Sequence, residues 1–240
     1  MERKAPHIGT LNEKPLHAAL KTWYAEEGDA FEVPIDGFVA DIVRGNLIIE
    51  IQTGSVSALR RKLSALIPRH PIRLVVPIPA EKVICHQDAD GIPSKMPRRS
   101  PKRGDILDVF LELVSIPRLL ADPNFSVEVV LVRLDEVRRA APGRRRRVPW
   151  TVHERRLVTV VDSFVLDHPG DYLAAIPPTV VEPFTTAEIA EAIGRPRRLA
   201  QKIAYSLREM DVLVAVGKRG NAILYRRNLA ASAPATGDTL

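Results

Sequence analysis

The chain has 240 residues, of which 45% are hydrophobic, and carries a formal net charge of +6. This length suffices for one large domain or two small ones with cores of their own, and the single cysteine excludes an internal disulfide bond. No apolar run approaches the roughly 18 residues of a membrane-spanning helix, and the N-terminus lacks a signal-type apolar core. The composition predicts a soluble cytoplasmic protein that does not engage a membrane.

The first third of the chain alternates between helical and extended patterns. Apolar residues at helical spacing in residues 11–27 predict a helix, and period-two alternation predicts a first strand at Phe31–Ile35. A hairpin then follows in residues 38–52, and residues 55–67 have the pattern of an amphipathic helix that ends before Pro68. Residues 72–78 form a buried-type strand. The expected order is therefore helix, three strands, helix, strand.

The hairpin is the most informative stretch of the sequence. Gly45-Asn46 suits a two-residue turn, so that Ile42 faces Ile49 and Asp41 faces Glu50 across the strands. Directly opposed residues have Cβ atoms about 5 Å apart, and Gln52 points to the same face as Glu50. Ile42, Ile49 and Ile51 point to the other face.

Two opposed carboxylates destabilise a sheet unless a positive charge lies between them. A divalent cation is one such charge, and oxygen ligands suit Mg²⁺ or Mn²⁺. Asp41 and Glu50 are therefore candidate metal ligands. The alternative is that each forms an ion pair with a surface arginine and has no further role.

The middle of the chain is more polar. Residues 88–104 predict a loop, residues 105–120 a helix that continues to Pro117, and residues 126–134 and 156–165 two strands. Two basic clusters stand out, one at Lys95, Arg98, Arg99, Lys102 and Arg103, the other at Arg138, Arg139 and Arg144–Arg147. Each suits an anionic partner, most often nucleic acid, and each equally suits a solvated basic loop.

Residues 183–229 form a second unit in the sequence. Thr185 and Glu188 make a capping box that opens a helix, and a second helix begins at Arg195-Pro196. Val212–Val216 and Ala222–Arg226 alternate like two strands, joined by the basic loop 217–221. Helix, turn, helix and basic hairpin is the layout of a winged helix-turn-helix. Residues 166–182 are expected to be a linker and residues 230–240 a disordered tail.

The outer side of the second helix and the hairpin tip are rich in residue types that commonly contact DNA. Arg and Gln side chains can hydrogen-bond to bases, whereas Lys and Tyr more often contact phosphates. The candidate DNA-binding residues are Arg197, Arg198, Gln201, Lys202, Tyr205, Arg208, Lys218 and Arg219. A plain solvated helix face would have the same composition.

The order of elements over residues 8–79, together with Asp41, Glu50 and Gln52, resembles the PD-(D/E)XK nuclease superfamily. The usual signature is Pro-Asp on one strand and Glu-x-Lys on the next. This chain has Ala40 before Asp41 and Gln52 in the place of the lysine, a Glu-x-Gln variant. Many members also carry a glutamate on the first helix, and Glu13 is the matching residue here.

The resemblance implies an α/β fold, with an αβββαβ restriction-endonuclease-like core plus a small α+β winged-helix domain. The nuclease-like domain would span residues 8–165, with its core at 8–79 and an extension at 80–165. Asp41 and Glu50 would bind Mg²⁺ or Mn²⁺, and Glu13 would hold a second metal ion or orient water. Neutral Gln52 cannot supply the positive charge of the family lysine, a role open to Lys62 on the next helix. Members of this superfamily often form homodimers.

The resulting hypothesis is a metal-dependent nuclease-like protein that cleaves phosphodiester bonds in DNA, most readily double-stranded DNA. Loss of the family lysine favours a catalytically inactive DNA-binding regulator on the same fold. A third alternative is a structural partner in a DNA-processing complex.

Overall fold

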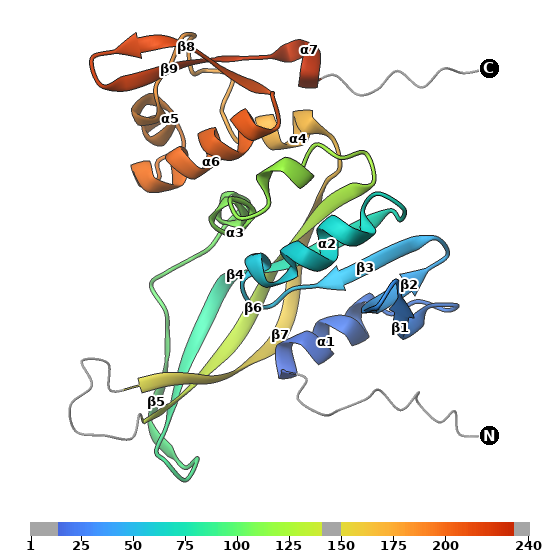
Figure 1. Ribbon diagram of the computed structural model, residues 1–240. Coiled ribbons are helices and arrows are strands. Elements are labelled where there is room, and N and C mark those ends of the chain that lie inside the picture. The colour runs from blue at the N-terminus through green and yellow to red at the C-terminus, as the bar shows by residue number, and fades with distance from the viewer. Residues whose placement is uncertain (1–13, 141–149, 233–240) are drawn as a thin grey trace. The chain divides into compact units, whose positions relative to one another are not determined.

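A computed structural model gives the fold of the chain and describes residues 14–140 and 150–232 (Figure 1). Glu13 and the arginine run 144–147 lie outside the described residues, as do the last residues of the expected tail. The structure is mixed α/β, with one large sheet and several helices. In the part of the chain that is described, no helix combines the length and the apolar composition needed to cross a bilayer.

The first four elements follow the sequence prediction closely. They are α1 (Pro15–Tyr24), β1 (Ala30–Ile35), β2 (Phe38–Arg44) and β3 (Leu47–Ile51). β2 and β3 are antiparallel, and Ile42 pairs with Ile49 as expected. Gly45 has a φ of +59°, a left-handed conformation that glycine adopts at little cost in the turn.

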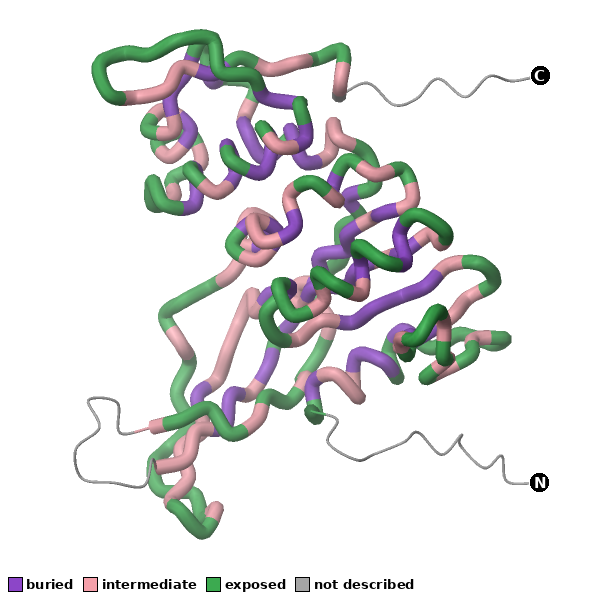
Figure 2. The backbone as a smooth tube through the Cα atoms, in the orientation of Figure 1, coloured by how far each residue is buried: buried purple, intermediate pink, exposed green. Residues whose placement is uncertain are grey.

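The helix after the hairpin begins as a 3-10 turn, η1 (Val56–Leu59), and continues as α2 (Arg60–Leu66). The strand β4 (Ile72–Gln87) that follows is longer than its apolar segment predicts. Its first half is buried and its second half is half-buried (Figure 2), because the apolar side chains give way to polar ones after Ile78.

The expectation of a loop throughout residues 88–104 is wrong, because β5 (Pro93–Arg99) lies within them and pairs with β4. Every residue of β5 is exposed, so no apolar alternation marks it. Two prolines also argue against a strand in the sequence, but an edge strand tolerates them.

The expected single helix at 105–120 is instead three short pieces. They are η2 (Ile106–Val109), α3 (Phe110–Leu113) and η3 (Pro117–Leu119). Pro117 opens the last piece rather than simply ending a helix, which fits the preference of proline for a first helical position.

Two long strands complete the large sheet, β6 (Phe125–Ala140) and β7 (Trp150–Leu166). The strand order is β1-β2-β3-β4-β6-β7, with β5 paired to β4 off this path. The backbone N–H of Ile72 donates to Asn124, and Arg139 donates to Gln87 at the other end of the pair. The start of β4 thus contacts the start of β6, and the end of β4 contacts the end of β6. The two strands therefore run parallel, and the sheet is mixed.

The C-terminal segment adds four helices and a two-stranded sheet. These are α4 (Pro169–Leu173), α5 (Thr186–Ala192), α6 (Arg197–Glu209), β8 (Leu213–Arg219), β9 (Ala222–Arg227) and α7 (Leu229–Ser232). The expected linker 166–182 contains α4, and Tyr172 within it is buried. The β8–β9 turn is at Gly220-Asn221, so the strands are longer and the loop tighter than predicted.

Contacts group the residues into two compact units. One comprises Met1–Thr53, Val75–Asp105 and Val130–Ser163, and the other comprises Gly54–Leu74, Ile106–Val129 and Phe164–Leu240. In the first unit, one face of α1 packs on the sheet through Leu16, Leu20 and Tyr24. These side chains meet Ile42, Ile49 and Ile51, which confirms the predicted apolar face of the hairpin.

One side chain of α1 departs from its expected place. Trp23, one of the apolar residues at helical spacing in residues 11–27, is 48% exposed, whereas Lys21 is buried and forms an ion pair with Glu32. A lysine can bury its aliphatic stem when its ammonium group meets a carboxylate.

Candidate functional site

The acidic site on the hairpin is built around Asp41 at the end of the β2–β3 pairing. The backbone pairing of β2 with β3 ends at Ile42 and Ile49. Beyond that pair the strands are joined through a side chain, because Asp41 Oδ2 accepts the Ile51 N–H at 2.8 Å. The Asp41 carboxylate therefore lies beside the residue that follows Glu50. Asp41 is held in one orientation by the backbone of the neighbouring strand.

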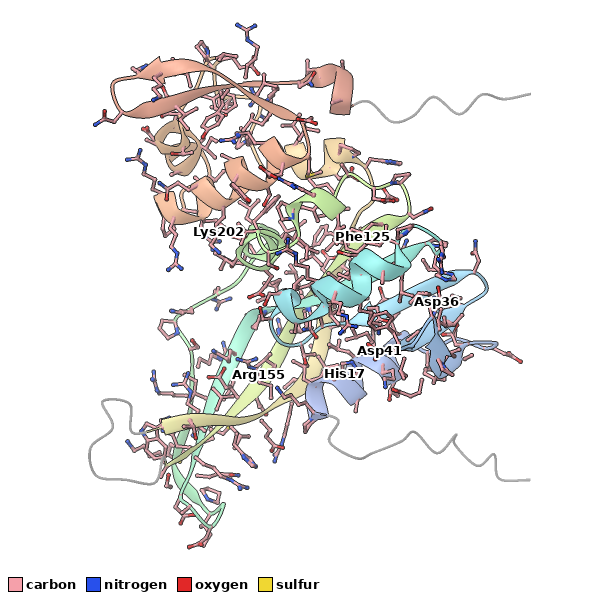
Figure 3. The ribbon with its side chains drawn as sticks, in the orientation of Figure 1. His17, Asp36, Asp41, Phe125, Arg155 and Lys202 are labelled. Carbon is pink, nitrogen blue, oxygen red and sulfur yellow. The ribbon has the colours of Figure 1, made fainter. Side chains whose placement is uncertain are left out.

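His17 completes this arrangement from α1 (Figure 3). Its Nε2 lies 3.1 Å from Asp41 Oδ2, and each side chain is 18% exposed. His17 was not among the candidate site residues predicted from the sequence. A residue 24 positions away from its partner has no local signal, and only the orientation of α1 on the sheet brings the two together.

The other predicted catalytic residues are spread over the structure. Glu50 is 2% exposed on β3, and the backbone N–H of Gln52 donates to Val75 on β4. Lys62 lies half-buried on α2, in the second compact unit. Glu13 lies outside the described residues.

The fit of this site to a divalent cation is partial. Asp41 and Glu50 supply carboxylate oxygens, the ligands that Mg²⁺ and Mn²⁺ prefer. Among residues 14–140 and 150–232, no three histidine, cysteine or acidic side chains lie together as a metal site requires. Asp41 Oδ2 is already engaged by His17 and by Ile51.

Arg44 at the end of β2 ties the hairpin to the chain after α1. Its guanidinium donates to Asp29, to Glu26 and to the carbonyl of Tyr24. The hydrogen bond from Arg44 lowers the pKa of Asp29 below its usual value, against the opposing effect of burial. This clamp fixes the end of β2, three residues after Asp41, to the segment that follows α1.

In the second unit, the predicted capping box at the start of α5 is confirmed. Thr185 Oγ1 accepts from the Glu188 N–H, and Glu188 in turn accepts from the Thr185 N–H. α6 follows after a short turn and buries Leu199, Ile203 and Leu207.

The polar residues of α6 divide between two sides. Arg197, Gln201 and Arg208 form an exposed stripe, and Arg198 and Tyr205 beside it are also exposed. Lys202 is turned the other way, because its Nζ donates to the Leu111 carbonyl of α3 at 3.0 Å. Five of the six predicted residues of this helix therefore remain at the surface.

Two further contacts fix α6, and the segment just before it, to neighbouring short helices. Arg195 forms an ion pair with Asp108, and Arg118 of η3 donates to Glu209 at 2.9 Å. These contacts orient α6 within its unit, and among the described residues they leave the stripe of Arg197, Gln201 and Arg208 exposed.

The two predicted residues of the hairpin tip also differ from each other. Both are exposed, but Arg219 also donates to Glu188 at 2.9 Å. The hydrogen bond from Arg219 lowers the pKa of Glu188, and the bonds from Thr185 add to the effect. Arg219 thus links the tip of the hairpin to the cap of α5.

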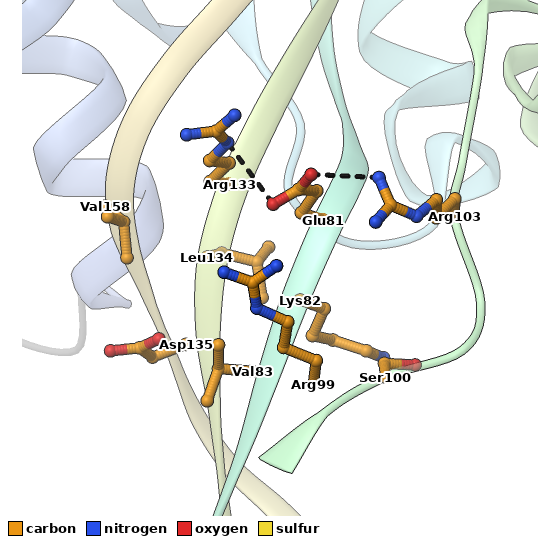
Figure 4. Close-up of a pocket in the computed structure, with 10 residues that line it drawn as sticks. All are labelled: Glu81, Lys82, Val83, Arg99, Ser100, Arg103, Arg133, Leu134, Asp135 and Val158. Atoms are coloured by element: carbon orange, nitrogen blue, oxygen red, sulfur yellow. Dashed lines mark hydrogen bonds and ion pairs between the residues drawn. The ribbon is translucent and has the colours of Figure 1, made fainter. Parts of the chain in front are cut away.

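Two hollows were not foreseen from the sequence. A groove of about 650 Å³ in the second unit is lined by Ser57, Arg60, Ser64, Val114, Ser115, Ile116, Pro117, Arg118, Leu119, Tyr205 and Glu209. A smaller pocket of about 190 Å³ lies in the first unit (Figure 4). In it, Glu81 bridges Arg103 and Arg133, and Arg99 also lines the pocket.

A family model described as a domain of unknown function, DUF8091, matches residues 14–167. The chain belongs to the DUF8091 family. The matched range takes in the large sheet and α1, and it ends before α4.

A second similarity extends beyond the segment that the family model matches. An uncharacterized protein of Treponema pallidum (strain Nichols) is 27% identical over 223 residues, which cover 92% of this chain and 87% of that protein. Its similarity therefore extends from the DUF8091 segment into the C-terminal helices. No solved structure matches the chain significantly.

Proposed function

We propose that this DUF8091 protein binds double-stranded DNA through the exposed stripe of α6. The observation that carries the proposal is the division of α6 into two sides. Lys202 and Glu209 contact α3 and η3, which leaves Arg197, Gln201 and Arg208 facing outward on a single stripe. Arginine and glutamine are the side chains best suited to base edges in the major groove.

The surrounding elements support the same proposal. α4 is followed by a single bridge between Phe184 and Tyr225, then by α5, α6 and the β8–β9 hairpin. This is the order of elements in a winged helix-turn-helix, in which the second helix enters the major groove and the hairpin contacts the backbone. Exposed Lys218 lies on the hairpin where such a contact would form.

The first test removes two charges from the stripe. Arg197→Ala with Arg208→Ala is expected to weaken binding of a short duplex about tenfold, because each arginine neutralises phosphates or pairs with bases. The slope of log affinity against log salt should fall by about 2. Fluorescence anisotropy over a salt series measures both quantities.

A matched control removes the same charge from another helix of the same unit. Arg61 and Arg69 are exposed on and just after α2, and their double alanine variant should bind with an affinity within about twofold of the parent. Equal losses in the two double variants, or no loss in either, would remove α6 from the interface.

The second candidate function is metal-dependent cleavage of DNA at the hairpin acids. Two observations favour it: the order helix, three strands, helix, strand, and the hydrogen bond that holds the Asp41 carboxylate beside the strand of Glu50. The order matches the αβββαβ core of the PD-(D/E)XK superfamily. Asp41 and Glu50 would hold a bound Mg²⁺ or Mn²⁺ ion, which supplies an activated water and stabilises charge on the phosphate.

His17 would position Asp41 in this reaction. The cleavage hypothesis predicts Mn²⁺- or Mg²⁺-dependent nicking of plasmid DNA that Asp41→Asn reduces by at least about a hundredfold. His17→Gln should leave a measurable rate, since glutamine can still donate to Asp41. If no DNA form is cut with either cation, the protein is a DNA-binding regulator without nuclease activity. If DNA is cut and Asp41→Asn is as active as the parent, the hairpin acids do not carry the cleavage.

A further inference from the structure

The first unit carries a concentration of positive side chains that the α6 proposal does not use. Lys95, Arg98 and Arg99 of the first basic cluster lie on β5, and Arg138 and Arg139 of the second lie on β6, so described members of both clusters flank the same strand, β4. β5 lies against one edge of β4 and β6 against the other. Cations from both clusters therefore meet across the second half of β4.

The strand register assigns these cations to faces of the sheet. Lys82, Ile84 and His86 alternate onto one face of β4. Arg98 pairs with Ile84 and Lys95 pairs with His86, with one extra residue of β5 in a bulge between the two pairs. Lys95 and Arg98 therefore share the face of Lys82 and His86, whereas Arg99 lies on the opposite face.

A buried carboxylate binds Lys82 and brings two more cations to the same face. Glu136 is 2% exposed, and it accepts from Lys82 at 3.0 Å and from Arg138 at 2.6 Å. Arg155 of β7 lies 3.4 Å from the same carboxylate. One acid thus serves side chains from three neighbouring strands.

The far end of this face is an aromatic stack. His86 and Trp150 lie parallel with their ring centroids 4.3 Å apart, and the Lys95 ammonium lies 5.2 Å from the Trp150 ring. Burial lowers the pKa of His86, and the charges of Lys95, Arg138 and Arg98 lower it further. Those three cations therefore converge on one imidazole.

We call these side chains the basic face. It consists of Lys82, Lys95, Arg98, Arg138 and Arg155. The five cations come from four strands: Lys82, Arg138 and Arg155 share the carboxylate of Glu136, and Lys95 lies against the Trp150 ring of the His86–Trp150 stack. Neighbouring strands are about 4.8 Å apart, so the five cations lie in closely spaced rows. Glu136 neutralises only part of their charge, which leaves a positive surface suited to an anion of high charge density.

We propose that the basic face binds the phosphate backbone of DNA, as a contact separate from α6. Duplex DNA presents one negative charge per ~1.7 Å of helix axis and can therefore meet several cations of a flat sheet at once. Guanidinium groups bind phosphate oxygens in a bidentate manner. The Trp150 ring is covered by His86, so the contact is to the backbone and independent of base sequence.

The inference rests on the proposed function only for the choice of DNA as the polyanion. The test variant is Lys95→Gln with Arg98→Gln, because both residues are exposed and neither contacts the buried Glu136. We expect duplex affinity to fall about tenfold and the salt slope to fall by about 2. Anisotropy with duplexes of two unrelated sequences should give the same loss.

The matched control removes two charges from the same neighbourhood of the chain. Arg99→Gln with Lys102→Gln changes Arg99 on the opposite face of β5, beside the small pocket, and Lys102 in the following segment. We expect a change within about twofold. An equal loss in this control would mean that overall charge, not the basic face, sets the affinity.

The α6 variant separates the two proposals. If it binds like the parent while the basic-face variant loses affinity, the α6 proposal fails and this one stands. If the basic-face variant keeps its DNA affinity but no longer binds vesicles that contain an anionic phospholipid, the face binds a membrane surface and the inference is overturned. Unchanged DNA affinity without vesicle binding overturns it as well.

Discussion

Replacing Phe184 by alanine is expected to lower the free energy of unfolding by about 4 kcal/mol. Phe184 is fully buried, and its backbone exchanges two hydrogen bonds with Tyr225 at 3.0 and 2.7 Å. The Arg227 guanidinium lies 5.0 Å from the centre of its ring. Truncation removes the ring from the core and leaves a cavity between the hairpin and the start of α5.

Phe164 is a suitable control for this prediction. It is 37% exposed near the end of β7, so Phe164→Ala should cost less than about 1 kcal/mol. Urea denaturation followed by far-ultraviolet circular dichroism measures both variants. Similar losses in the two variants would mean that Phe184 does not anchor the hairpin to the C-terminal helices.

The second large effect is expected at Glu136. Glu136→Gln should lower the free energy of unfolding by about 3 kcal/mol, because it leaves Lys82, Arg138 and Arg155 without the carboxylate they share. Glu81→Gln is the matched control. Its partners Arg103 and Arg133 are 65% and 54% exposed, so the loss there should stay below about 1 kcal/mol.

The pH dependence of stability should distinguish the same two residues. Burial raises the pKa of Glu136, but hydrogen bonds from Lys82 and Arg138 outweigh burial and bring the pKa below its ordinary value of 4.5. The stabilisation is therefore fully present above that value and is lost as the pH falls through the lower pKa of the folded state.

Acid titration of stability gives the measurement. The parent should lose stability over that acid range more steeply than Glu136→Gln, whereas Glu81→Gln should follow the parent. Parallel curves for all three proteins would show that the carboxylate of Glu136 is not the charge that holds these strands together.

The hairpin shows how far local sequence can predict this fold. Gly45-Asn46 permits a tight turn, and the isoleucines on either side alternate, so register and faces follow from nearest neighbours. The capping box of Thr185 and Glu188 is equally local and was equally predictable. Both signals span only a few residues.

The parts that escaped prediction depend on contacts distant in sequence. β5 has no apolar face because every residue in it is exposed, so its pairing with β4 leaves no pattern. His17 reaches Asp41 only because α1 packs on the sheet in one orientation. Lys202 resembles a DNA contact in the sequence, but the carbonyl of Leu111 binds its ammonium group.

The basic clusters illustrate a third case. Composition alone indicates an anionic partner for each cluster, but it cannot tell which cations share a surface. The bulge in β5 moves Lys95 and Arg98 to the same face, and Glu136 adds cations from β6 and β7. A prediction of the surface therefore needs the register of four strands.

Site-specific cross-linking tests most directly whether DNA lies on the exposed stripe of α6. A thiol at Gln201→Cys, in a Cys85→Ser background, should form a disulfide with a thiol-modified base in a short duplex, because Gln201 lies on that stripe. A thiol at Ala65→Cys, exposed on α2 in the same unit, should not. No cross-link at position 201, or equal yields at the two positions, would contradict DNA binding by α6.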